Sequence, residues 1–260
     1  MSGALTYEVR DNVAWIEFDD GGPNALKTEV FNAYFDSLDS AEADDAVGAV
    51  VIAGREGFFS AGMDLKWMES AGREELGTIG PNLARLAHRI VIFPKPVIAA
   101  VEGHAIAGGA VVLLACDRSV GATGSYKVGL NEVALGIPFG GFALTLARLH
   151  LTPTAFGSAL LHGELHRPDR AHALGYLDEL ADPAAVRSRA GEIAARAATL
   201  NVSAYRIAKQ AMRGEVAERI RGQIESGELV PLFQDFDDLR KAGPGRATGG
   251  AAPPPVRSRP

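Results

Sequence analysis

The chain has 260 residues, a formal net charge of -6 and a single cysteine, Cys116. The acidic balance argues against nucleic-acid binding as the main function, and one cysteine cannot form an internal disulfide. No apolar run approaches the ~20 residues of a membrane span, and the N-terminus lacks the regions of a signal peptide. We therefore expect a cytoplasmic globular protein with a sizeable core.

The first segments predict a strand, a helix and a second strand. Residues 13–18 (VAWIEF) indicate a strand, and Gly21 to Asn24 ends it. Thr28 is the expected N-cap of a helix, because the apolar residues after it recur at helical spacing: Val30, Phe31, Tyr34, Phe35 and Leu38. Residues 47–52 indicate the next strand. This order predicts an α/β architecture with right-handed crossovers.

Two apolar strands each run through small residues into a helix. Residues 50–54 lead into FSAGMDLK (59–66), and residues 97–101 lead into GHAIAGGA (103–110). The first N–H groups of a helix are unpaired and carry the positive end of its dipole, which suits a developing negative charge. Two such turns could aim one N–H group each at the same point. The alternative is that the glycines only permit close packing of helix on strand.

The rest of the chain divides into strand pieces at 118–127, a third small-residue segment, GLNEVALGIP (129–138), and a mostly helical C-terminal part. Helices are predicted at 139–149, 154–161, 168–174, 183–200, 203–213 and 216–239. We expect a core at 1–200, a C-terminal helical region at 201–240 and a tail at 241–260. The tail is rich in Pro, Gly and Ala and is predicted to be disordered.

The segments FSAGMDLK, GHAIAGGA and GLNEVALGIP resemble the signature segments of the crotonase (enoyl-CoA hydratase/isomerase) superfamily. The resemblance extends over roughly residues 5 to 240, in the family's order. It implies an α/β spiral of ββα units with a helical C-terminal region, and an acyl-CoA thioester as substrate. No cofactor is implied beyond the coenzyme A of the substrate. It also implies a homotrimer or a pair of trimers, and a mobile pocket wall, disordered near residues 70–80.

The resemblance also assigns chemical roles. It makes the backbone N–H groups of Met63 and Gly108 the two donors of an oxyanion hole for the thioester enolate. Hydratases of the family carry two glutamates, and these positions fall on Val111 and Glu132. One glutamate is the pattern of the Δ3,Δ2-enoyl-CoA isomerases, in which a single carboxylate moves a proton from C2 to C4 without water. Glu132 is therefore the predicted base and acid, and an apolar pocket would raise its pKa.

Further site residues are implied by the same alignment of segments. Contacts to coenzyme A or substrate are expected from Ala25, Leu26, Ala61, Asp64, Leu65 and Lys66, the first two belonging to an Asn-Ala-Leu motif. The acyl pocket is expected at Val111, His104 and Leu135, although His104 also fits the role of a packed residue. Structural hydrogen bonds are expected from Asp64 and Asp117. The six histidines lack metal-ligand spacing, so no metal site is predicted.

Three functions stay open from the sequence. The preferred one is an isomerase that uses Glu132. The second is a hydratase in which a carboxylate of the 69–75 region replaces the one missing at Val111. The third is a non-catalytic paralogue that binds CoA or RNA, against which the acidic balance and the retained Glu132 argue. For Glu132 itself, the alternative is an exposed glutamate beside a turn. A dinucleotide fold is disfavoured, because no GxGxxG follows the first strand.

Overall fold

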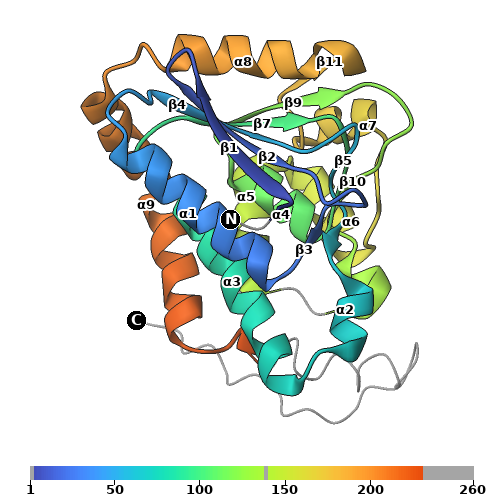
Figure 1. The fold of residues 1–260 in the computed structure, drawn as a ribbon. Coiled ribbons are helices and arrows are strands. Elements are labelled where there is room, and N and C mark those ends of the chain that lie inside the picture. The colour runs from blue at the N-terminus through green and yellow to red at the C-terminus, as the bar shows by residue number, and fades with distance from the viewer. Residues whose placement is uncertain (1–2, 138–139, 231–260) are drawn as a thin grey trace.

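The computed structural model describes residues 3–137 and 140–230 (Figure 1). Its largest sheet has six strands in the order β1-β2-β4-β7-β9-β11. Their bounds are β1 Leu5–Arg10, β2 Val13–Phe18, β4 Ala49–Ala53, β7 Val97–Val101, β9 Arg118–Ala122 and β11 Glu179–Ala181. β1 and β2 pair antiparallel, and the following neighbours pair parallel.

Two smaller sheets complete the strands. One has the order β10 (Val128–Gly129), β8 (Gly103–Ile106) and β5 (Gly57–Ser60), and the other pairs β3 (Ala25–Leu26) with β6 (Gly62–Met63). The pairs β4–β5, β7–β8 and β9–β10 each give one strand to the large sheet and one to the three-stranded sheet. Helical segments follow each pair: α2 (Leu65–Ser70) and α3 (Arg73–Val91), then α4 (Gly108–Ala115), then the 3-10 turn η1 (Glu132–Leu135) and α5 (Gly141–His150). This arrangement confirms the predicted spiral of ββα units.

Both faces of the large sheet are covered. Successive side chains of a strand point to opposite faces. In β4, Val50 and Ile52 therefore join the main core with α1 (Thr28–Ala43), α3 and α4, whereas Val51 packs in a second cluster against α8 (Val186–Ala197). Figure 1 shows α8 on one side of the sheet and α1 and α3 on the other. Burial on both faces explains why the strands read as continuous apolar runs.

The C-terminal part differs from the prediction in its divisions. The helix expected at 183–200 is a 3-10 turn, η2 (Pro183–Ala185), followed by α8, and the short strand β11 was not predicted. The helices expected at 203–213 and 216–239 begin as one continuous helix, α9 (Val202–Glu225). A single glycine costs a helix only ~1 kcal/mol relative to alanine, so Gly214 does not divide it. The helices at α6 (Pro153–Leu161) and α7 (Pro168–Leu174) lie where expected. The predicted tail at 241–260 lies outside the described residues.

Two local predictions were wrong. Thr28 is the first residue of α1, and Lys27 occupies the N-cap without a side-chain hydrogen bond. The segment near 70–80, expected to be disordered, lies mostly in α3, which begins at Arg73. Leu76 and Ile79 of this segment are buried against Met68, and this packing outweighs the glycine content. Among the helices of the described ranges, none is long and apolar enough to cross a membrane.

Candidate active site

The two predicted oxyanion turns are in contact. A Cβ placed on Gly62 would lie 3.0 Å from the Ile106 carbonyl oxygen and 3.1 Å from the Gly108 nitrogen. Between them, Ala107 has φ 51°, a left-handed value uncommon for a residue with a side chain, so the chain turns sharply before α4. The structure thus brings the segment of Met63 against that of Gly108.

The start of α4 favours negative charge at this point. Val111 N donates to Ala107 O at 3.0 Å, so the N–H groups of residues 108–110 precede the first intrahelical bond of α4. All residues of α4 are buried. In such a water-poor environment the helix dipole and the unpaired N–H groups act strongly on a nearby charge.

The residues expected to contact coenzyme A lie on adjoining elements. Ala25 and Leu26 in β3 pair with Gly62 and Met63 in β6, and Ala61 N donates to Pro23 O at 2.9 Å. These contacts place Ala61 and the two β3 residues next to one another in and beside the two-stranded sheet.

Asp64 follows directly and caps α2. Its Oδ1 accepts a hydrogen bond from Trp67 N at 3.0 Å, which confirms the structural hydrogen bond expected of Asp64. Leu65 and Lys66 begin α2 and are exposed. The six predicted contact residues therefore form one continuous strip from β3 to the first turn of α2.

Glu132 is a buried carboxylic acid. It is the first residue of η1, and its side chain belongs to a residue only 6% exposed. Its Oε2 has no hydrogen-bond partner among the described residues. Burial raises the pKa of Glu132 to about 7. The alternative of an exposed glutamate beside a turn is therefore excluded, and the group can both take and return a proton near neutral pH.

The three residues expected in the acyl pocket differ in their surroundings. Val111 is buried on α4, about one turn after its start, whereas Leu135 at the end of η1 is 40% exposed. The ring of His104 lies 5.1 Å from that of Phe58 and 5.7 Å from that of Tyr126, measured between centroids. These contacts agree with a packing role for His104.

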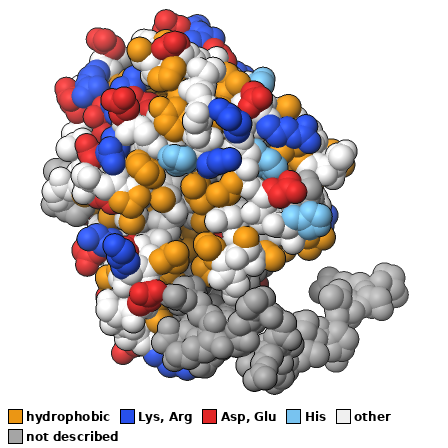
Figure 2. Space-filling model, turned by 90° about the vertical axis from the view of Figure 1, so that its right-hand side faces the viewer, with side chains coloured by type: hydrophobic (Ala, Val, Ile, Leu, Met, Phe, Trp, Pro, Cys, Tyr) orange, Lys and Arg blue, Asp and Glu red, His pale blue; other side chains and the backbone are white. Residues whose placement is uncertain are grey.

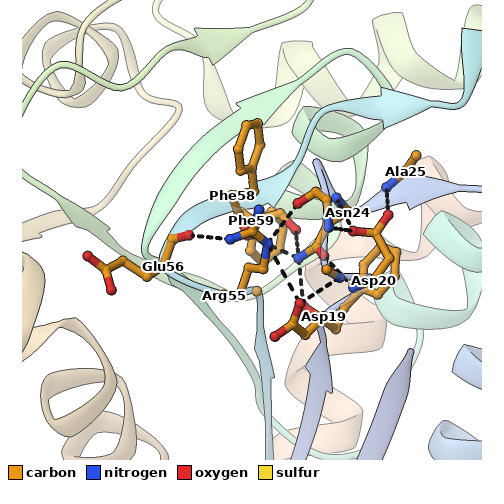
Figure 3. Close-up of polar contacts among 12 residues, drawn as sticks. Asp19, Asp20, Asn24, Ala25, Arg55, Glu56, Phe58 and Phe59 are labelled. Atoms are coloured by element: carbon orange, nitrogen blue, oxygen red, sulfur yellow. Dashed lines mark hydrogen bonds and ion pairs between the residues drawn. The ribbon is translucent and has the colours of Figure 1, made fainter. Parts of the chain in front are cut away.

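Sequence reasoning missed the network that holds the entry to β3 (Figure 3). Asn24 is fully buried with φ 54°. Its Nδ2 donates to Phe18 O at 2.6 Å, to Phe58 O at 3.1 Å and to Phe59 O at 3.3 Å. One amide group thus fastens the end of β2 to β5. The available signal was Asp20 followed by Gly-Gly-Pro-Asn, a composition typical of side-chain-closed turns.

Asp20 completes this network. Its carboxylate accepts hydrogen bonds from the backbone N–H groups of Gly22 at 2.7 Å, Asn24 at 2.9 Å and Ala25 at 2.8 Å. Burial acts to raise the pKa of Asp20, but these three hydrogen bonds, with Arg55 nearby, hold it below its ordinary value. The ionised carboxylate therefore fixes the backbone of Ala25.

A second network anchors the far end of α4, and sequence reasoning predicted Asp117 in it but not its partners. Asp117 accepts a hydrogen bond from Lys209 Nζ at 2.7 Å and lies 3.1 Å from Arg213. Arg213 also donates to Ala115 O at 2.9 Å and to Cys116 O at 3.1 Å. These contacts confirm the structural hydrogen bonding expected of Asp117. Two cations of α9 thus lie at the C-terminal end of α4, where they complement its dipole.

Neither network resembles a metal site. Within residues 3–137 and 140–230, no three His, Cys, Asp or Glu side chains come close enough together to hold a metal ion.

The chain is similar in sequence to known proteins. The model of the family "Enoyl-CoA hydratase/isomerase" matches residues 8–241. A putative enoyl-CoA hydratase of Thermus thermophilus is 36% identical over 190 residues, covering 72% of this chain and 74% of that protein. The mitochondrial enoyl-CoA delta isomerase 1 of Rattus norvegicus is 29% identical over 238 residues, covering 88% of this chain and 81% of that protein.

A solved structure gives the same result. The crystal structure of a probable enoyl-CoA hydratase from Mycobacterium tuberculosis superposes with a TM-score of 0.84 at 35% identity. The match covers 92% of this chain and 99% of that one.

Proposed function

The chain belongs to the enoyl-CoA hydratase/isomerase family, and from this premise we propose that it moves the double bond of a 3-enoyl-CoA thioester to the 2-position. Glu132 acts as the single base and acid. The backbone N–H groups of Met63 and Gly108 hold the thioester oxygen.

The observation that carries the proposal is that Glu132 is buried and that Val111, at the position of the other family glutamate, is also buried. Val111 stands where hydratases of the family have their first glutamate, and a valine can neither activate water nor transfer a proton. Glu132 has a pKa of about 7 because of burial, and its Oε2 is free of protein hydrogen bonds within the described residues. One carboxyl group with these properties is sufficient to carry a proton between two carbons of the same substrate.

In the proposed reaction, the carboxylate of Glu132 removes a proton from C2 of the 3-enoyl thioester. The electron pair delocalises onto the thioester oxygen, where the two N–H groups stabilise the dienolate. The protonated Glu132 then returns the proton to C4, and the double bond moves from C3–C4 to C2–C3. The proton balance closes within the enzyme and substrate, so no water is consumed.

We assign coenzyme A contacts to the strip that runs from Ala25 to Lys66, and the acyl chain to the region of Val111 and Leu135. Ile137, after η1, belongs to the same buried cluster as Met68 of α2, so η1 and α2 lie on the same side of the molecule. They expose Leu65, Val133 and Leu135. The face that carries α2 and β10 presents hydrophobic side chains between the charged ones (Figure 2). Exposed apolar groups of this kind suit an acyl chain.

Hydration of a 2-enoyl-CoA is the second candidate, because one of the relatives above is named a hydratase and the other an isomerase. It requires another acid–base group. The carboxylates of the 69–75 region, Glu69, Glu74 and Glu75, belong to exposed residues. This exposure favours the isomerase over the hydratase.

We also propose a homo-oligomer of three or six subunits. Large apolar side chains are exposed just before α9, at Leu200, and along its N-terminal half, at Ile207 and Met212. Burial of these side chains against another copy of the chain would remove apolar surface from water. Sedimentation equilibrium checks the assembly, and a monomer at micromolar concentration would contradict it.

The experiment that tests the function is a side-by-side assay on 3-enoyl-CoA and 2-enoyl-CoA. Conjugated product from the first without hydration of the second supports the proposal. Rapid hydration of the second makes the protein a hydratase, and inactivity on both with CoA esters still bound makes it a non-catalytic paralogue. Glu132→Gln should abolish turnover while the fold persists, whereas Glu164→Gln, at an exposed glutamate, should leave turnover unchanged.

A further inference from the structure

Ser60 lies where the β3 entry and the first oxyanion turn meet. It is the last residue of β5 and is buried. Its Oγ donates to Asn24 O at 2.7 Å and accepts from Gly62 N at 3.1 Å. One hydroxyl group therefore joins the loop held by Asn24 to the residue before Met63.

The backbone of Ser60 also touches the second turn. A Cβ placed on Gly109 would lie 2.3 Å from Ser60 O and 2.8 Å from Ser60 Cβ. Only a glycine allows α4 to approach so closely. Ser60 is thus in contact with residues next to both predicted donors, Met63 and Gly108.

We propose that Ser60 is a positioning residue that fixes the separation and direction of the two N–H donors. This inference rests on the proposed function, since it assigns a role in enolate stabilisation. The Ser60 hydroxyl proton points to Asn24 O, so a lone pair is directed at Gly62 N–H. Asn24 is itself held in place, because its side-chain amide donates hydrogen bonds to the carbonyl groups of Phe18, Phe58 and Phe59.

Loss of this hydroxyl would leave Gly62 N–H buried without a partner, and the turn would shift to find one. An oxyanion hole acts only when its donors lie about 2.7–3.1 Å from the developing charge, so a small shift lowers the rate of enolate formation. Binding of coenzyme A along the strip from β3 to α2 does not depend on that distance.

The test uses Ser60→Ala and Ser60→Cys, the second of which fills the site with a weakly hydrogen-bonding atom. The control is Ser37→Ala, which removes an equally buried hydroxyl that donates to Ala33 O at 2.7 Å within α1. Two rates are measured: turnover of 3-enoyl-CoA, and exchange of the C2 hydrogens of a saturated acyl-CoA with deuterium oxide by NMR. Exchange reports enolate formation followed by passage of the abstracted proton from Glu132 to solvent.

We expect kcat and the exchange rate to fall together by roughly tenfold or more in both Ser60 variants, with KM and the Kd of free coenzyme A within about twofold. Ser37→Ala should retain both rates. Wild-type rates in folded Ser60 variants would overturn the inference, and so would unfolding of both variants, which would make the role structural. Absence of turnover of 3-enoyl-CoA by the wild-type protein would refute the proposed function itself, whatever the variants do.

Discussion

Lys209 and Asp117 form a buried ion pair across 92 residues of sequence, with 2.7 Å between Nζ and Oδ2. Replacing Lys209 removes one of the two cations beside the buried carboxylate of Asp117 and leaves Arg213, at 3.1 Å, as the other. We expect Lys209→Met to lower the free energy of unfolding by roughly 2 kcal/mol in urea denaturation, less than the loss of both cations would cost. Arg221→Met is the matched control on α9, because its pair with Glu218 is exposed and should contribute less than ~1 kcal/mol. Equal effects of the two substitutions would contradict this account.

The pH dependence of catalysis should follow Glu132. The base must be ionised to remove a proton, and burial raises its pKa to about 7. We therefore expect kcat/KM for the 3-enoyl substrate to rise with pH and to level off above neutrality, with a midpoint near 7. A rate profile from about pH 5 to pH 9 measures this. A midpoint close to the ordinary glutamate value would show that the carboxyl group is solvated.

The same raised pKa predicts that the stability of the protein falls as pH rises, whereas its activity rises. Glu132 ionises near 4.5 in the unfolded chain and near 7 in the folded one, so the folded state loses stability as pH rises between these values. Glu132→Gln escapes this loss. The difference in free energy of unfolding between Glu132→Gln and the wild type should therefore shift in favour of the variant by roughly 3 kcal/mol when the pH is raised from 4 to 8. Urea titrations at both pH values test the prediction, which fails if the difference between the two proteins is independent of pH.

Two glycine-to-alanine substitutions should act in opposite directions. At Gly109 the added methyl group would lie 2.3 Å from Ser60 O, so Gly109→Ala should destabilise the protein by roughly 2 kcal/mol or more and lower activity. At Gly214, inside α9, nothing lies within 4 Å of the added group. Gly214→Ala should stabilise the protein by ~0.5–1 kcal/mol with activity unchanged. Thermal unfolding distinguishes the two, and a destabilised Gly214→Ala would show that α9 is strained there.

The sequence predicts the elements whose signal is local. The spacing of Val30, Phe31, Tyr34 and Leu38 indicates a helix that buries one face, and these four side chains are buried in α1. The apolar run at 97–101 is a strand with both faces covered. In each case the residues that decide the structure are close neighbours in the chain.

Features that depend on distant partners were not predictable. α9 carries Lys209 and Arg213, whose positions in the sequence indicate ordinary solvated cations, and only the fold brings them to Asp117. The burial of Glu132 could not be read from its neighbours, because most glutamates are exposed. Its proposed role rests on resemblance to a family. Packing against Met68 likewise decided the state of the 70–80 segment, where glycine content favoured disorder.

The anchoring of α4 has a consequence for biosynthesis. During translation, Asp117 leaves the ribosome before the two cations that neutralise it, and Ala217 and Ile220, which belong to the main core, follow later still. A nascent chain that ends near residue 200 therefore lacks both cations that face Asp117, whose carboxylate keeps, of its hydrogen bonds to described residues, only the one from Val97 N, and it exposes apolar surface on α3 and α5, the helices that α9 covers. The support of the predicted oxyanion turn is therefore complete only when α9, the last of the described helices, has joined the fold, 92 residues after Asp117 in the case of Lys209.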